Sequence, residues 1–205
     1  MRRLDKTNRP CIWSGFSYAG DMSSPGDPAP TEAPSPAPSP APAPASPPVT
    51  PAPEFDVSEW IGEPSPLASL RGKVVLVEAF QMLCAGCVNY GIPQAQRVAR
   101  MFPDVAVIGL HTVFEHHDVT GPEALKVFLH EFGVRFPVGI DRHDGEHGPG
   151  QALPATMRTY RMEGTPTTLL FDKHGQLVFQ HLGKVDDLAL GVMIGQLIAA
   201  PGPEA

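Results

Sequence analysis

From residue 73 onward, short apolar runs alternate with longer segments in which apolar residues recur at every third or fourth position. The short runs are typical of buried strands, and the longer periodic segments indicate helices with one buried face. The pattern predicts strands at residues 73–80, 105–110, 136–140, 165–171 and 176–182, and helices at residues 84–102, 121–132, 155–160 and 186–199. This β-α-β-α-β-α-β-β-α order combines crossover connections with a closing hairpin. We therefore expect an α/β fold in which a central mixed β-sheet carries helices on both faces.

The predicted helices have recognisable ends and buried faces. Gly133 is a C-cap for the second helix, Asp186 or Asp187 caps the last one, and Gly175 supplies the positive φ of the hairpin. Pro93 predicts a kink in the first helix. The side chains expected to be buried are Val88, Ile92, Ala95, Val98, Ala99 and Phe102 in the first helix, Leu125, Phe128, Leu129 and Phe132 in the second, and Leu188, Val192, Met193, Leu197 and Ile198 in the last.

The N-terminal part of the chain has a different composition. Between residues 25 and 53 almost every second residue is proline, with alanine and serine between the prolines. Such a segment forms neither a ladder nor a helix and has little apolar surface to bury, so it predicts a solvated polyproline-II spacer. We expect residues 1–53 to be a disordered tail and Pro/Ala/Ser-rich linker, and residues 54–201 to be one globular domain. A passive linker is the favoured interpretation, and binding of SH3-like partners is the alternative.

Charge and hydropathy argue against two classes of partner. The net charge of −7 does not fit a nucleic-acid-binding surface, and no run of about eighteen apolar residues suggests a membrane span. Polar residues soon after Arg2-Arg3 interrupt the apolar core that a secretory signal needs. We therefore expect a cytoplasmic monomer. Export is the alternative for its location, and Met22 is an alternative start.

The candidate chemistry lies where the first strand meets the first helix. The chain has three cysteines, Cys11, Cys84 and Cys87, which is too few for a disulfide-stapled scaffold and typical of cysteines that do chemistry. A thiolate at a helix N-terminus faces unpaired backbone N–H groups and the positive end of the dipole, so Cys84 is expected to be nucleophilic. Cys87 follows about one helical turn later, close enough for a disulfide. Cys11 is interpreted as a chance thiol in the tail.

Three further features accompany the Cys84-Ala-Gly-Cys87 motif. Glu78 lies six residues before Cys84, Gly164-Thr-Pro-Thr-Thr precedes a strand, and Leu169-Leu-Phe-Asp-Lys-His-Gly175 enters the hairpin. In this order and spacing, the chain resembles the thioredoxin-like superfamily, particularly its TlpA-like disulfide-reductase and AhpC/TSA-related branch, over about residues 55–200. The resemblance implies a thioredoxin-like fold, a buried acid at Glu78 and a cis peptide bond before Pro166.

Each of these residues then has an expected role in thiol–disulfide exchange. Cys84 attacks a substrate disulfide, and Cys87 resolves the mixed disulfide. Glu78 accepts the proton of Cys87, directly or through water, with a pKa raised by burial; an outward-facing acid without a catalytic role is the alternative. Thr165 and Pro166 leave a strand edge for the substrate backbone. The predicted function is a protein disulfide oxidoreductase that works with a redox partner and needs no cofactor.

The sequence departs from the family pattern in two places. Leu83 stands where family members usually carry Trp before the first cysteine, and Gln81 and Met82 precede it. Pro93 lies six residues after Cys87 instead of the usual five, and a π-bulge at the active-site end of the helix could absorb the extra residue. The dithiol is unaffected, but partner choice and redox potential are left open.

Other functions stay open as alternatives. A peroxiredoxin needs Pro and Thr where this chain has Val77 and Gln81, although Gln81 could still donate a hydrogen bond to a peroxide. A copper or other metal site could combine the two thiols with a histidine, for which His111, His116 and His117 are the candidates. The favoured interpretation is that His111 only borders the active site and that His116 and His117 lie on a solvated loop. His143 and His147 are likewise interpreted as residues of a solvated loop. An inactive, tethered interaction module is the third alternative, and the presence of both cysteines argues against it.

Overall fold

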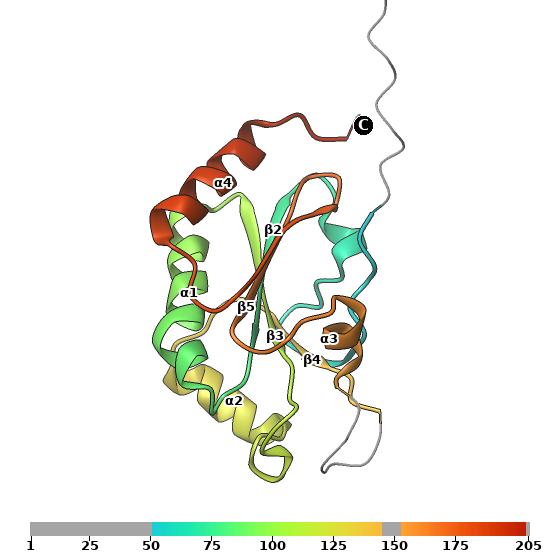
Figure 1. Cartoon of the computed structure of the whole chain (residues 1–205), viewed down its shortest axis with the longest axis vertical. Helices are drawn as coiled ribbons and strands as arrows, with labels where there is room; N and C mark the ends of the chain where they lie inside the picture. The colour runs from blue at the N-terminus through green and yellow to red at the C-terminus, as the bar shows by residue number, and fades with distance from the viewer. Residues whose placement is uncertain (1–50, 145–152, 204–205) are drawn as a thin grey trace, which may run out of the picture. The chain divides into compact units, whose positions relative to one another are not determined.

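The computed structural model describes residues 51–144 and 153–203, and within them a six-stranded sheet forms the centre of the domain (Figure 1). The strand order is β1-β4-β3-β2-β5-β6. β2 pairs in parallel with β3, and β3 with β4, whereas the β1–β4, β2–β5 and β5–β6 pairs are antiparallel. The strands are β1 (Val57–Ile61), β2 (Val74–Phe80), β3 (Val105–His111), β4 (Val138–Asp141), β5 (Thr167–Phe171) and β6 (Leu177–Leu182). The expected mixed sheet is thus confirmed.

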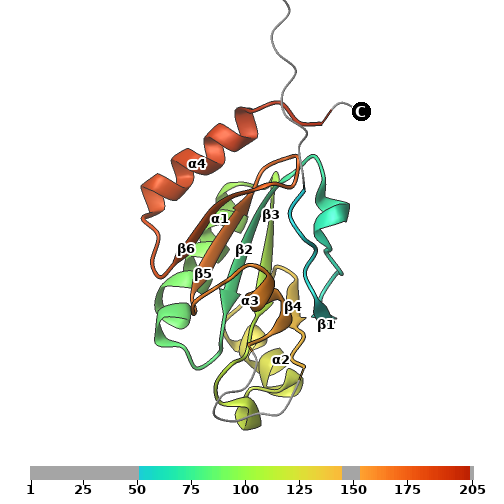
Figure 2. The same cartoon turned by 45° about the vertical axis from the view of Figure 1, so that its right-hand side comes forward.

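Helices cover both faces of this sheet (Figure 2). α1 (Ile92–Met101) and α4 (Asp187–Ala199) pack on one face with side chains of β2, β3 and β5, and α2 (Pro122–Glu131) covers the end of that face near Phe80. The opposite face is covered by α3 (Ala155–Thr159), the short 3-10 helix η1 (Leu67–Leu70) and the segment that begins at Ala52. The remaining elements are the π-helix η2 (Cys87–Gly91) and the 3-10 helix η3 (His117–Val119).

The central strand β2 is buried along its whole length. All seven of its residues are buried, because it has strands on both sides and helices on both faces. Alternate side chains enter different cores: Val75, Val77 and Ala79 face α3, while Val74 and Leu76 face α1 and α4. Burial on both faces explains why the sequence of β2 is a nearly continuous apolar run. Glu78 is the exception in that run.

The edge strand β1 was not predicted, because its sequence, VSEWI, has no continuous apolar run. It forms by pairing antiparallel with β4, where Trp60 lies opposite Gly139. A Cβ at Gly139 would approach Val57 to 2.8 Å, so the glycine lets the two strands lie close together. The segment before β1 is also tied down, since Ala52 N–H donates to the carbonyl of Gly175 (2.9 Å) and the Tyr160 hydroxyl donates to the carbonyl of Pro53.

The first helix differs from the single helix expected at residues 84–102. Its N-terminal part is the π-helix η2, where the N–H of Ile92 donates to the carbonyl of Cys87, and the regular helix α1 begins only at Ile92. Pro93 therefore lies in the first turn of α1, where a missing N–H is tolerated. The π turn expected for the extra residue between Cys87 and Pro93 is present, whereas the kink at Pro93 stays a prediction. Ile92, Ala95 and Val98 are buried as expected, but Ala99 is exposed and Val88 half-buried.

The caps are confirmed, whereas two predicted helix faces are partly wrong. The carboxylate of Asp186 accepts from the N–H groups of Leu188 and Ala189, and Gly133 and Gly175 have positive φ. In α4 the fully buried side chains are Leu190 and Ile194, while Leu188 is 82% and Val192 60% exposed. α4 is apolar almost all round, so periodicity could not select its buried face. Phe132 at the end of α2 is likewise exposed.

No helix within residues 51–144 or 153–203 has both the length and the apolar character that crossing a membrane requires.

β3 ends in a buried histidine. His111 is 1% exposed, its ring centroid lies 5.4 Å from that of Phe80, and its Nε2 finds no hydrogen-bond partner within residues 51–144 and 153–203. Burial lowers the pKa of His111 from its ordinary value of 6.5 to about 4. The imidazole is therefore neutral near pH 7.

Two glycines, Gly191 in α4 and Gly109 in β3, differ in the space around them. A Cβ at Gly191 would meet nothing within 4 Å, whereas a Cβ at Gly109 would lie 2.9 Å from Cγ2 of Val138 and 3.1 Å from the Phe80 ring. We predict that Gly191→Ala raises the free energy of unfolding by about 0.5–1 kcal/mol through helix propensity. Gly109→Ala should lower it by about 1–3 kcal/mol through overpacking. Urea unfolding of both variants measures the changes, and a loss of stability in Gly191→Ala would show that this face of α4 is covered.

His111 makes stability depend on pH. Between pH 6.5 and pH 4 the unfolded chain binds more protons at this position than the folded protein, so the free energy of unfolding falls as the pH drops through that range. Relative to His111→Leu, we expect the protein to lose about 3 kcal/mol between pH 7 and pH 4. The difference between the two proteins at each pH is the quantity to compare, because other titrating groups, including Glu78, contribute equally to both. A constant difference would contradict the prediction.

Candidate active site

The two cysteines lie at the end of β2 where the helix begins, and they differ in accessibility. Cys84 is half-buried, whereas Cys87, the first residue of η2, is 0% exposed. Both are free thiols. The N–H of Cys87 donates to Sγ of Cys84 (3.2 Å), and the Cys84 thiol donates to the carbonyl of Thr165 (3.4 Å). A thiol reagent can therefore reach Cys84 more readily than Cys87.

The buried thiol is also the harder one to ionise. Burial and, to a smaller extent, the hydrogen bond with the Cys84 thiol raise the pKa of Cys87 to about 12. Such a thiol reacts as a nucleophile only when a neighbouring group removes its proton.

The loop that contacts Cys84 contains the cis peptide bond expected between Thr165 and Pro166. Two hydrogen bonds hold this loop in place: the Thr167 hydroxyl donates to the carbonyl of Gly164 (2.7 Å), and the N–H of Gly183 donates to that of Pro166 (2.7 Å). The helix approaches the loop at Gly86, where a Cβ would lie 2.9 Å from Cδ of Pro166. The glycine of the Cys84-Ala-Gly-Cys87 motif thus permits the close contact between the dithiol and the cis proline.

Glu78 lies in β2 with its carboxyl group on the α1 side of the sheet. It is 1% exposed, so the outward-facing alternative is wrong. The Thr168 hydroxyl donates to Oε2 (2.9 Å), and Oε1 is buried without a hydrogen-bond partner among the described residues. Burial raises the pKa of Glu78 to about 8, while the hydrogen bond from Thr168 acts in the opposite direction. At neutral pH the carboxyl is mostly protonated and titrates close to the physiological range.

Gly91, at the end of η2, contacts this carboxyl. A Cβ there would overlap Oε1 of Glu78 and would lie 2.9 Å from Cβ of Pro166. The carboxyl oxygen and the ring of Pro166 therefore both lie against Gly91, about one turn after Cys87. Sequence reasoning missed both Gly91 and Thr168. The only signals were the extra residue before Pro93 and the second threonine after Pro166.

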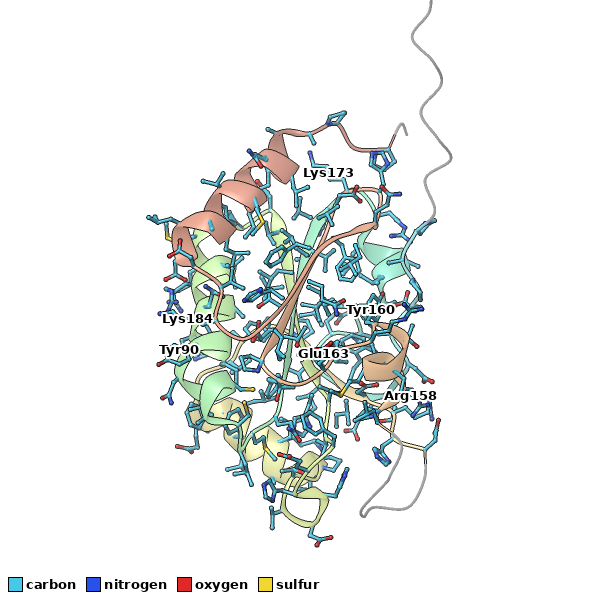
Figure 3. All side chains as sticks on the ribbon, viewed as in Figure 1. Tyr90, Arg158, Tyr160, Glu163, Lys173 and Lys184 are labelled. Carbon is cyan, nitrogen blue, oxygen red and sulfur yellow. The ribbon has the colours of Figure 1, made fainter. Side chains whose placement is uncertain are left out.

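The residues before Cys84 play different parts. Gln81 is 5% exposed. Its side-chain Oε1 accepts from the N–H groups of Phe114 and Glu115 (3.1 and 3.2 Å), so the side-chain amide of Gln81 fixes the backbone that follows β3. Leu83 is 61% exposed beside Cys84 and gives this rim an apolar surface. On the helix side of the cis proline, the Lys184 ammonium lies over the Tyr90 ring, 5.1 Å from its centroid (Figure 3).

The candidate histidines of the described residues contact other aromatic rings. His111 is packed against Phe80 in the sheet, and the rings of His117 and His143 lie 4.9 Å apart. Within the described ranges, no group of three or more His, Cys, Asp or Glu side chains is arranged to hold a metal ion. Cys11, most of the Pro-rich linker and His147 lie outside the described residues.

Comparison with known proteins agrees with this site, although no family model matches the chain. A thioredoxin-like superfamily protein of known crystal structure is 49% identical; the match covers 76% of this chain and 100% of that one, with a TM-score of 0.70. The crystal structure of a thiol-disulfide isomerase from Corynebacterium glutamicum is 52% identical over 74% of this chain and 97% of that one, with a TM-score of 0.67. The curated thiol-disulfide oxidoreductase ResA of Bacillus thuringiensis is 29% identical over 133 residues, 65% of this chain and 68% of ResA. The chain therefore belongs to the thioredoxin-like superfamily and, within it, to the ResA/TlpA/DsbE-like branch of thiol-disulfide oxidoreductases.

Proposed function

We propose that this thiol-disulfide oxidoreductase acts on protein disulfides through Cys84 and Cys87, with Cys84 as the attacking thiol. The observation that carries the proposal is the unequal burial of the pair: Cys84 is half-buried at the surface, and Cys87 is 0% exposed behind it. The exposed side chain of Leu83 beside Cys84 supports a protein as substrate. Thr165 and Pro166 provide the edge along which the substrate backbone lies.

The exchange takes two steps. The Cys84 thiolate attacks one sulfur of the substrate disulfide, forms a mixed disulfide, and releases the other substrate sulfur as a thiolate, which takes a proton from solvent. Cys87 then transfers its proton to the ionised carboxyl of Glu78, directly or through water, and attacks Sγ of Cys84. The Cys84–Cys87 disulfide forms, and the second substrate thiolate leaves. The substrate disulfide is reduced to two thiols, the enzyme dithiol is oxidised, and a dithiol redox partner restores it.

Glu78 suits the role of proton acceptor for two reasons. Its Oε1 has no hydrogen-bond partner among the described residues and lies against Gly91 of the thiol-bearing helix. Burial raises its pKa to about 8, which brings its proton affinity closer to that of the Cys87 thiol. An ordinary carboxyl would be a much weaker base.

The assignment of the two thiols can be tested by trapping. Cys87→Ser leaves the mixed disulfide without a resolving thiol, so we expect it to accumulate covalent complexes with a disulfide-bonded substrate such as insulin. Non-reducing electrophoresis and mass spectrometry of the linked peptide detect them. Cys84→Ser is the control and should trap none. Trapping by Cys84→Ser alone would reverse the two roles.

The role of Glu78 can be tested by the pH dependence of resolution. Because the carboxyl must be ionised to accept a proton, the rate at which Cys87 resolves the mixed disulfide should rise with pH to an inflection near 8. We expect Glu78→Gln to lose this inflection and to slow resolution near pH 8 by at least about 100-fold, the low end of general-base effects of about 10²–10⁴. Glu163→Gln, on the exposed loop before the cis proline (Figure 3), is the matched control. An unchanged rate in Glu78→Gln would remove Glu78 from the mechanism.

A further inference from the structure

The carboxyl group of Glu78 is held from two sides by residues distant in sequence. On one side, β2 and β5 pair antiparallel with Glu78 directly opposite Thr168, so both side chains point to the same face of the sheet. The Thr168 hydroxyl then donates to Oε2 at 2.9 Å. This contact takes one of the two carboxyl oxygens.

On the other side, the π turn brings a glycine onto the same group. Gly91 has a helical backbone conformation (φ −60°, ψ −59°), so no positive φ requires glycine at this position. What requires it is space: a Cβ would overlap Oε1 of Glu78 and press on Pro166. Gly91 is the last residue of η2, where the helix carries one more residue than a regular turn.

We propose that Thr168 and Gly91 are positioning residues for thiol–disulfide exchange, which direct the free oxygen of Glu78 toward the proton of Cys87. This inference rests on the function proposed above. The Thr168 hydroxyl donates its hydrogen bond to Oε2. The absence of a side chain at Gly91 leaves room for Oε1. The carboxyl is thereby confined to one orientation, with one oxygen committed and the other available.

Among the described residues, burial and the Thr168 hydroxyl are the causes that shift the pKa of Glu78. The helix packed against it carries the thiols of Cys84 and Cys87 and the phenol of Tyr90, over which Lys184 of the loop after β6 lies. On β3 the residue opposite Glu78 is Gly109, and His111 lies two residues further on the same face. The pKa of Glu78 responds to burial first and to the Thr168 hydroxyl second. A change at Thr168 should therefore be visible in the pH profile of resolution.

The experiment compares Thr168→Val with Thr168→Ser in the full chain. Val removes the donor to the carboxylate while keeping the branched shape, so the inflection of the resolution rate should move up by about one pH unit, the size expected for a hydrogen bond to a charged group. The rate near pH 7 should fall about tenfold. Ser keeps the hydroxyl and should retain the original inflection. An inflection that does not move in Thr168→Val would overturn the inference.

A double-mutant cycle separates positioning from general packing. In the Glu78→Gln background, Thr168→Val should change the resolution rate less than twofold, because the group through which it acts is gone. An equal loss in both backgrounds would show that Thr168 only supports the structure. If Glu78→Gln itself leaves the profile unchanged, the proposed proton acceptor fails together with this inference. If Glu78→Gln alters the profile and Thr168→Val does not, only the inference fails.

Gly91→Ala tests the second contact, with Gly191→Ala as its matched control. Both substitutions add one methyl group to a glycine in a helical segment, but only the first methyl would meet Glu78. We expect Gly91→Ala to lose the inflection and slow resolution at least tenfold near pH 8, and Gly191→Ala to leave both unchanged. The rate at which Cys84 forms the mixed disulfide is measured for each, because an equal slowing of both steps in Gly91→Ala would show that the methyl group acts through Pro166 and would overturn the role of Gly91 toward Glu78. Normal resolution by a folded Gly91→Ala protein would overturn the role of Gly91.

Discussion

A carboxyl group in the central strand of the sheet is the costly feature around which this site is built. β2 is buried at all seven positions, and Glu78 has strands on both sides and the thiol-bearing helix above it. An ionised carboxylate in such surroundings loses most of its hydration, which is why its pKa rises to about 8. The protein tolerates the group by keeping it mostly protonated at neutral pH and by supplying one hydrogen bond from Thr168. The same burial makes the carboxyl a stronger base when it does ionise.

The rest of the site depends on close approach of backbone segments to this carboxyl and to the thiols. The helix meets the cis-proline loop at two glycines, Gly86 and Gly91, and in both cases an added Cβ would lie 2.9 Å from an atom of Pro166. The loop is itself held by hydrogen bonds from the Thr167 hydroxyl and from the N–H of Gly183, which lies between β6 and α4. The dithiol therefore lies against a loop whose backbone is held by hydrogen bonds on both sides of Pro166.

The departures from the family pattern are accommodated locally. The extra residue before Pro93 forms the π turn, whose last residue is the glycine that faces Glu78. The side-chain amide oxygen of Gln81 accepts hydrogen bonds from the backbone after β3. Leu83, in place of the usual Trp, presents an exposed apolar side chain next to Cys84. The contacts of the helix with Glu78 and Pro166 thus form despite the extra residue, while the surface beside Cys84 carries a leucine in place of the tryptophan.

The sequence by itself determined the elements whose signals are local. The apolar run of β2, the Cys84-Ala-Gly-Cys87 motif at the helix start, the cap at Asp186 and the turn at Gly175 all follow from periodicity, turn chemistry and short spacings. The cis bond at Pro166 and the burial of Glu78 were predicted because the motif resembled a known family. Only the tertiary structure decided the pairing of β1 with β4, the buried face of α4, and the contacts of Thr168 and Gly91 with Glu78. The physical reason is that these depend on residues brought together from distant parts of the chain, such as Glu78 and Thr168, 90 residues apart. In α4, where nearly every position is apolar, the choice between Leu190 and Leu188 was made by the sheet on which the helix packs.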